Sequence, residues 1–187
     1  MLGRPFVFGP AMPLYPTTPA EHPEIAALMN SAFLATGPVR GWTTEADCID
    51  GEPNDAATLA RDLATWPSAR LHVWRDAPDA PIVGCVWLEP LGKEAWYLGL
   101  LTVRPDLQDR RLGRNLLAAA EAVAAGEGAR GIRMAVVNVR DTLIAWFERR
   151  GYVLTGETLP FPYDDPTYGA ARRPDLAFVT LEKVFGG

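Results

Sequence analysis

Residues 95–125 constrain the fold more than any other part of the chain. Residues 95–103 form an apolar run with strand character, and Pro105 ends it because proline has no N–H to give a neighbouring strand. A short polar turn follows, after which apolar residues recur at helical spacing over 112–125. The sequence therefore predicts a strand that leads through a tight turn into a helix.

The start of this predicted helix suits an anionic ligand. The N–H groups of a first helical turn have no intrahelical partners, and the helix dipole favours negative charge there. Gly113 lets a ligand approach the backbone closely, and Arg110, Arg111 and Arg114 add positive charge around the turn. The pattern indicates a phosphate or pyrophosphate site. From these residues alone, a solvated basic helix start remains the alternative.

The rest of the chain alternates irregularly between strands and helices. Thr18, Pro19 and Glu21 form a helix-start signal with a capping box, and a second amphipathic helix starts near Asn54 and places Leu59, Leu63 and Trp66 on one side. A further short helix covers 141–150, and the remaining predicted strands lie at 71–75, 82–88, 132–136, 152–155 and 175–184. Strands outnumber helices, so we expect an α+β domain with a mixed sheet and helices on both faces.

Size and composition narrow the classes of function. The 187 residues fit one domain, 1–187, with 1–13 as an irregular Pro- and Gly-rich arm. The formal charge of -5 disfavours nucleic acid and anionic membrane surfaces as partners. Without a signal-like segment or an apolar run near the roughly 20 residues of a membrane span, we expect a cytoplasmic protein. Cys48 and Cys85 fit no metal-ligand or disulfide spacing, so no metal is expected.

Two motifs in this order resemble the GNAT superfamily of acetyl-CoA-dependent N-acetyltransferases. Residues 103–117 are similar to its acetyl-CoA motif, Gln/Arg-x-x-Gly-x-Gly/Ala after a strand end, with Gln108 and Gly113 at the first and last fixed positions. Arg111 stands where the first glycine is usual, and a non-glycine residue fits there if its φ is negative. Residues 145–152 are similar to the downstream Tyr-Glu-Lys-Leu-Gly-Phe element.

This resemblance spans residues 14–184 in element order and implies a GNAT-like fold, with a mostly antiparallel sheet and splayed central strands. It also implies acetyl-CoA as cosubstrate, with pantetheine between those strands and pyrophosphate on the N–H groups of residues 109–114. Phe147 stands where many members have a proton-donating tyrosine, so we expect it to pack against pantetheine instead. The implied cofactor-binding residues are Leu101, Thr102, Val103, Gln108, Asp109, Arg110, Arg111, Leu112, Gly113, Arg114, Asn138 and Phe147.

Two residues are candidates for amine deprotonation. Tyr97 stands at about the position of a strand glutamate that serves as base in the histone-acetylating branch of the family. It could orient a water or the substrate amine, or simply cover the sheet. Glu89, near the end of the preceding strand, is the best nearby carboxylate for a base, although strand-end glutamates are commonly just solvated.

The acceptor is expected to be the primary amine of a small molecule. Trp42 and Glu45 lie between the first two helices, where family members commonly build the acceptor pocket, and Tyr163 lies in a late loop that can close the same cleft. Each of these residues could equally be an ordinary loop residue. The alternatives are a catalytically weak acyl-CoA-binding sensor and a protein-acetylating enzyme. The sequence leaves homodimer formation open.

Overall fold

The computed structural model describes residues 14–35, 37, 44–51, 54–92, 94–107, 111–165 and 168–186. The proposed arm 1–13 lies outside this part of the chain, as do four of the expected site residues: Trp42, Gln108, Asp109 and Arg110.

A seven-stranded sheet and four α-helices make up most of the described chain. In spatial order the strands are β1 (Leu14–Pro16), β3 (Arg70–Trp74), β4 (Gly84–Leu91), β5 (Ala95–Val103), β6 (Gly131–Val137), β9 (Ala177–Val184) and β7 (Val153–Pro160). The helices are α1 (His22–Phe33), α2 (Ala56–Thr65), α3 (Leu112–Gly126) and α4 (Asp141–Glu148). A two-stranded sheet pairs β2 (Ile49–Asp50) with β8 (Ala170–Ala171). No helix in the described residues is long and apolar enough to cross a bilayer.

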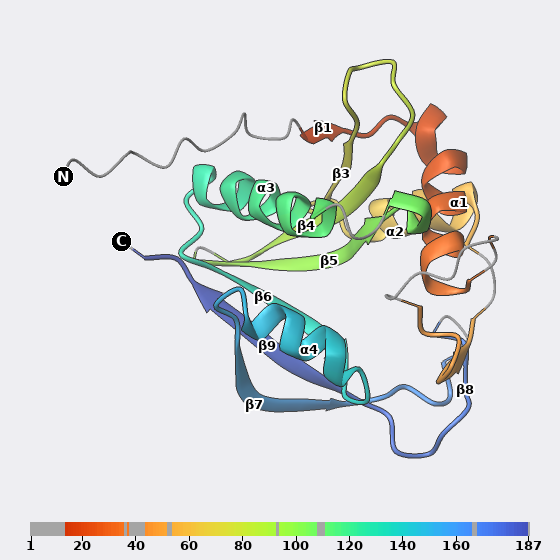
Figure 1. Cartoon of the computed structure of the whole chain (residues 1–187), viewed down its shortest axis with the longest axis vertical. Coiled ribbons are helices and arrows are strands. Elements are labelled where there is room, and N and C mark those ends of the chain that lie inside the picture. The colour runs from red at the N-terminus through yellow and green to blue at the C-terminus, as the bar shows by residue number, and fades with distance from the viewer. Residues whose placement is uncertain are drawn as a thin grey trace.

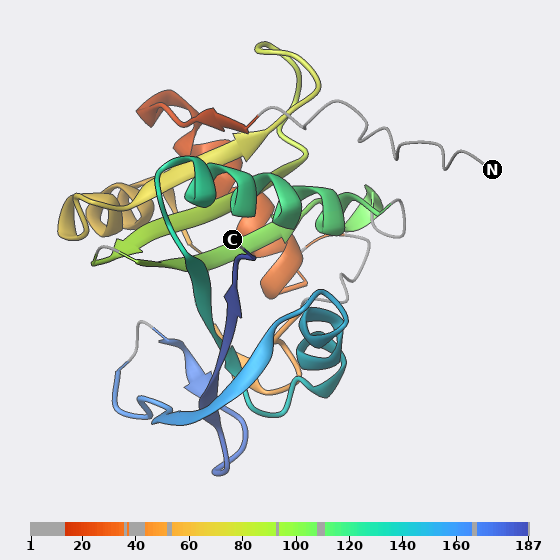
Figure 2. The same cartoon turned by 90° about the vertical axis from the view of Figure 1, so that its left-hand side faces the viewer.

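The predicted α+β architecture is confirmed. All neighbouring strands of the large sheet pair antiparallel except β5 and β6, which pair parallel. Figure 2 shows α1 and α3 on opposite faces of β4 and β5. The large sheet is therefore mixed and mostly antiparallel, with helices on both faces.

Alternation along the strands builds two cores, one on each face of the sheet. On β4, Val86 and Leu88 pack in the core that contains the buried side of α3, whereas Cys85 and Trp87 pack in the core that contains α1. This is the period-two pattern of a strand buried on both faces. The side chains of β5 divide in the same way, so Leu98 belongs to the α3 side and Tyr97 to the α1 side.

The predicted helix starts before α1 and α2 are present, but a 3-10 turn precedes α1 and Trp66 lies outside the packed side of α2. The Thr18 N–H donates to the Glu21 carboxylate at 2.6 Å, and the chain makes a 3-10 turn at Pro19–Glu21 before α1. At α2, Asp55 caps the helix by accepting from the Thr58 N–H at 2.7 Å. Trp66 is not part of the packed side of α2, because it lies at the C-cap and is 54% exposed.

The two central strands separate along their length. β5 and β6 pair only through Ala95↔Gly131, Trp96↔Ile132 and Tyr97↔Arg133, and then diverge (Figure 1). One half of the sheet continues as β4, β3 and β1, and the other as β9 and β7. The strands are splayed as the resemblance implied, and the gap between them opens beside α3 and α4 (Figure 1).

Candidate functional site

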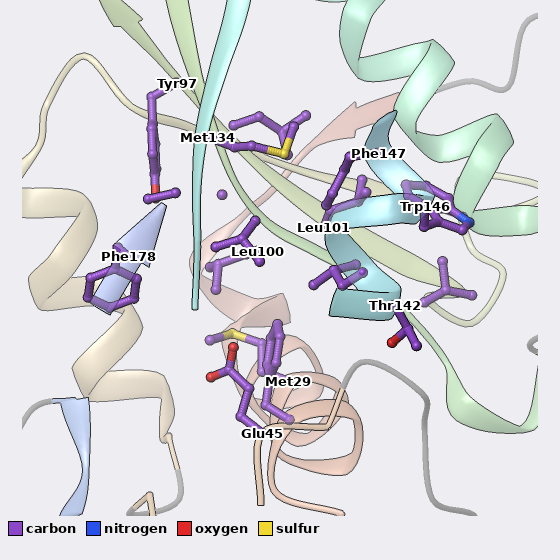
Figure 3. Close-up of a pocket in the computed structure, with 18 of the residues that line it drawn as sticks. Met29, Glu45, Tyr97, Leu100, Leu101, Met134, Thr142, Trp146, Phe147 and Phe178 are labelled. Atoms are coloured by element: carbon purple, nitrogen blue, oxygen red, sulfur yellow. The ribbon is translucent and has the colours of Figure 1, made fainter. Parts of the chain in front are cut away.

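A cavity of about 1020 Å³ occupies the region where β5 and β6 part (Figure 3). Its walls come from both strands, the start of α3, one side of α4, the segments around α1 and α2, and the chain near β8 and β9. Because these elements belong to both halves of the sheet, the splay itself creates the cavity.

On the β5 wall, a bulge interrupts the pairing with β4. Cys85 faces Thr102 and Trp87 faces Gly99, which leaves one additional residue in β5. Leu100 lies in this bulge and has a φ of +49°, a left-handed conformation that costs a non-glycine residue about 1–2 kcal/mol. Leu101 and Val103 line the cavity, whereas Thr102 is fully buried and is not part of the lining. Beyond Tyr97 the β6-facing edge of β5 has no pairing with β6, which suits an extended ligand.

The start of α3 forms one end of the cavity. Arg111, Leu112, Gly113 and Arg114 all line it. Among the described residues, the first N–H to bond within the helix is that of Asn115, which donates to the Arg111 carbonyl at 3.1 Å. The N–H groups of residues 112–114 precede it, as expected for a first helical turn that can bind an anion.

Arg111 does not meet the condition under which a non-glycine residue fits the first glycine position of the motif. That condition is a negative φ, but Arg111 has φ 62° and ψ 12°, in the left-handed region. The turn thus keeps the conformation that favours glycine, with an arginine in that place.

Gly113 has room for a Cβ among the described residues. A Cβ added at this position would lie 3.7 Å from Trp146 Cζ2, which is an ordinary van der Waals contact. Packing within the protein therefore does not require glycine here. The missing side chain instead leaves the backbone accessible from the cavity.

Residues at the end of α4 add to the same end of the cavity. Phe147 is 4% exposed and packs edge-on against Trp146 and Tyr152, with ring centroids 4.9 and 5.5 Å away. The Arg150 guanidinium lies over the Trp146 ring at 3.5 Å from its centroid. Burial lowers the pKa of Arg150, and the nearby charges of Arg149 and Arg114 lower it further.

These like charges make the basic end of the cavity favourable for an anion. Sequence reasoning assigned Phe147 to the site but overlooked Trp146, Arg149 and Arg150. All three belong to the 145–152 motif, so the two adjacent arginines were a usable signal.

The two candidates for deprotonation are cross-strand neighbours. Tyr97 lies at the last paired position of β5 with β6, and its side chain lines the cavity (Figure 3). Burial raises the pKa of its hydroxyl, and the charges of Tyr168 and Glu89 raise it further. Glu89 lies opposite Tyr97 on β4, on the same face of the sheet, but it is not part of the cavity lining.

Glu45 lies near the start of α4, because the preceding Thr44 contacts Arg140 there, whereas Arg149 and Arg150 follow the end of that helix. The Glu45 N–H donates to the Phe33 carbonyl at 2.9 Å, and the preceding Thr44 hydroxyl donates to the same carbonyl at 2.8 Å. Arg140, between β6 and α4, donates to the Thr44 carbonyl at 2.7 Å. Burial raises the pKa of the Glu45 carboxyl, and the charge of Arg140 opposes this shift. The side chain points into the cavity (Figure 3).

The small β2–β8 sheet joins two segments that are distant in sequence. Ile49 pairs with Ala171, and the Arg172 N–H donates to the Cys48 carbonyl at 2.9 Å. Gly169 has a φ of +78°, and a Cβ there would lie 2.6 Å from the Asp50 carbonyl oxygen. The chain around Tyr168 is therefore held tightly against the segment that follows Glu45.

Aromatic side chains from this region complete the wall near Glu45. Phe161, Tyr168 and Phe178 line the cavity, and their ring centroids lie 5.5 to 6.3 Å apart. Sequence reasoning named the late loop through Tyr163 but not Tyr168 or Phe178. Only the pairing of β2 with β8 and of β6 with β9 brings these two residues to the site.

Two further expected site residues lie outside the lining and have structural contacts. The Tyr163 hydroxyl accepts from the Leu176 N–H at 2.7 Å, which fixes the late loop. The Asn138 side chain donates to the Asp175 carbonyl at 2.9 Å and accepts from the Ala177 N–H at 3.0 Å. Asn138 thereby holds the end of β6 against the start of β9.

The family profile described as "Acetyltransferase (GNAT) family" matches residues 40–152, which is more than half of the chain. The chain belongs to the GNAT acetyltransferase family. This match includes α3 with its arginine-flanked start, the splayed strands β5 and β6, and α4. A comparison with curated proteins finds no match.

Solved structures of GNAT proteins share the fold at low sequence identity. A GNAT family acetyltransferase from Elizabethkingia anophelis with acetyl-CoA bound is 14% identical, with a TM-score of 0.59 over 94% of this chain and 99% of that chain. A ribosomal-protein-alanine N-acetyltransferase from Brucella melitensis is 16% identical, with a TM-score of 0.65 over 93% and 100%. An IAA acetyltransferase from Bacillus cereus is 15% identical, with a TM-score of 0.62 over 93% and 99%.

Proposed function

We propose that this GNAT protein transfers the acetyl group of acetyl-CoA to the primary amine of a small molecule by direct attack. One observation carries the proposal. A single cavity is lined by the basic start of α3, by β5 and β6 where they part, and by Glu45 with several aromatic rings. Direct transfer needs both substrates held together in one space, because positioning supplies much of the rate.

The residues present fit acetyl-CoA. The N–H groups of residues 112–114, with Arg111 and Arg114, would hold the pyrophosphate, and Gln108, Asp109 and Arg110 remain part of this proposal. Leu101 and Val103 on one side and residues 134–136 of β6 on the other would flank pantetheine, with Phe147 packed against it. When bound, acetyl-CoA supplies a thioester whose acyl carbon accepts the attacking nitrogen.

The chain's own residues would prepare the amine. Tyr97 keeps its proton because burial raises its pKa, so its hydroxyl can hydrogen-bond a water or the amine. Glu89, opposite it on β4, is a carboxylate that could take a proton through such a water. Phe147 has no proton to give, so the thiolate would leave unassisted or with help from another group. The modest basicity of a thiolate permits unassisted departure.

Two alternatives have specific support. A ribosomal-protein-alanine N-acetyltransferase is among the structural neighbours, so a protein N-terminus is a second candidate acceptor. Phe147 in place of a proton-donating tyrosine supports a sensor that binds acyl-CoA without turnover. We favour the small-molecule acceptor because the half-buried Glu45 and the buried ring of Phe161 line the same cavity, an arrangement that suits a small ligand.

The test is an acceptor screen with purified protein and acetyl-CoA. Small primary amines, amino acids and short N-terminal peptides would be compared by free thiol release, with the acetylated product identified by mass spectrometry. We expect amine-dependent thiol release with the small molecules, and loss of that release in Gly113→Val. Release with peptides alone would make this a protein-acetylating enzyme. Tight CoA binding in calorimetry, without release by any acceptor, would make it a sensor.

A further inference from the structure

Charged side chains are segregated along the cavity. Among the described lining residues, the cations are four arginines at the start of α3 and the end of α4: Arg111, Arg114, Arg149 and Arg150. The acidic lining residues in the same part of the chain are Glu45, which is anchored to the end of α1, and Asp62 of α2. The two substrates would therefore enter opposite electrostatic environments.

We call the part of the cavity lined by Glu45, Phe161, Tyr168 and Phe178 the acceptor end, and Glu45 is its carboxylate. Hydrogen bonds hold its segment in two places. The Glu45 N–H and the Thr44 hydroxyl donate to the carbonyl at the end of α1, and Arg140 donates to the Thr44 carbonyl from the other half of the sheet. Its side chain points between the walls of the cavity, near Met29 (Figure 3). A carboxylate in a partly buried site is costly unless a cation joins it. Arg140 meets part of this need, but burial still dominates the protonation equilibrium of Glu45.

The wall beside Glu45 is apolar and aromatic. Phe161 is 3% exposed, and its ring packs with those of Tyr168 and Phe178. Faces and edges of such rings bind an apolar body, and aromatic rings also attract an ammonium group. Binding pockets with this composition use a few polar groups to orient a mainly apolar ligand.

We propose that the acceptor end selects a primary amine on an apolar, ring-sized body that carries no carboxylate, with its ammonium group against Glu45. This inference rests on the proposed function and names the substrate class of the same site. An amino acid would bring its carboxylate close to Glu45, away from the four arginines that line the cavity; the cation beside Glu45 is Arg140, which donates to the Thr44 carbonyl. Like charges about 4 Å apart in a partly buried site repel strongly enough to cost at least about 100-fold in affinity.

Three probes of similar size separate the contributions of charge and ring. The probes are 2-phenylethylamine, L-phenylalanine and 3-phenylpropanoate, a cation, a zwitterion and an anion. Each would be titrated by calorimetry into protein saturated with CoA, and the first two would also be assayed with acetyl-CoA. We expect 2-phenylethylamine to bind at least about 100-fold more tightly than L-phenylalanine, with the anion weaker still.

Glu45→Gln keeps the shape of the side chain and removes its charge. It should reduce the preference for 2-phenylethylamine over L-phenylalanine to below about 10-fold while leaving CoA affinity intact. Asp164→Asn is the matched control, because Asp164 is an exposed carboxylate of the late loop outside the cavity lining. It makes the same change in net charge and should preserve the preference.

Each result decides the proposal. Equal binding of the amine and the amino acid, no binding of either, or an unchanged preference in Glu45→Gln would overturn it. If the amine binds with the expected preference but releases no thiol, the binding preference stands and the enzymatic proposal fails. If other acceptors release thiol while 2-phenylethylamine binds no better than L-phenylalanine, the enzyme stands and this inference fails.

Discussion

Replacing Gly113 separates ligand binding from folding. Among the described residues, a Cβ at this position meets only Trp146 Cζ2, at an ordinary 3.7 Å, and glycine is among the poorest helix formers. Gly113→Val should therefore cost little stability. The new side chain would instead stand between the helix-start N–H groups and a bound pyrophosphate. Losing one charge-assisted hydrogen bond costs about 1.5–3 kcal/mol, which corresponds to roughly 10- to 100-fold weaker CoA binding.

Gly126 provides the matched control on the same helix. It is the last residue of α3, a Cβ there meets nothing within 4 Å, and it is not part of the cavity lining. We expect Gly126→Val to bind CoA as the wild type does. Calorimetry would measure CoA affinity, and thermal unfolding would establish that both variants fold. Unchanged CoA affinity in a folded Gly113→Val, or equal losses in both variants, would refute the phosphate site at α3.

Further predictions concern strain, protonation and thiol reactivity. Arg111→Gly removes a left-handed non-glycine residue, so the free energy of unfolding should rise by about 0–1 kcal/mol, whereas Arg111→Ala should show no gain in chemical denaturation. Phe147→Tyr should keep or modestly raise turnover; a complete loss of turnover would contradict packing beside the thioester. Burial raises the pKa of Glu45, so acceptor kcat/KM should fall as pH drops through that raised pKa and the carboxylate is neutralised. Glu45→Gln should flatten this acidic limb, and an unchanged limb would exclude Glu45 as its source. Burial raises the pKa of Cys85 to about 12 and also that of Cys48, so neither thiol should react with Ellman's reagent until the protein unfolds; rapid labelling of the native protein would show that these cysteines are accessible.

Local sequence signals predicted the parts of the structure that local interactions determine. Thr18 and Glu21 signal a helix start through groups three residues apart, and Pro105 ends β5 because of its own chemistry. The position of Gly113 in a short motif is also a local signal, since it indicates a backbone that a ligand can approach. The structure places Gly113 in the cavity lining.

The acceptor end depends on distant contacts and was only partly predictable. Tyr168 reaches the cavity because β8 pairs with β2, more than a hundred residues earlier in the chain, and Phe178 does so through the β6–β9 pairing. The left-handed φ at Leu100 follows from register against β4, which no pattern within β5 reveals. At Arg111 the sequence itself is misleading, because the fold imposes a glycine-like conformation on a residue that is not glycine.

A crystal structure with both CoA and 2-phenylethylamine bound would test the central claim most directly, namely that one cavity brings the two substrates together. We predict the pyrophosphate at residues 111–114, pantetheine between β5 and β6, and the amine nitrogen between the CoA sulfur and Glu45. CoA located away from the gap between β5 and β6, or an amine bound outside the cavity with its nitrogen remote from the sulfur, would contradict the account.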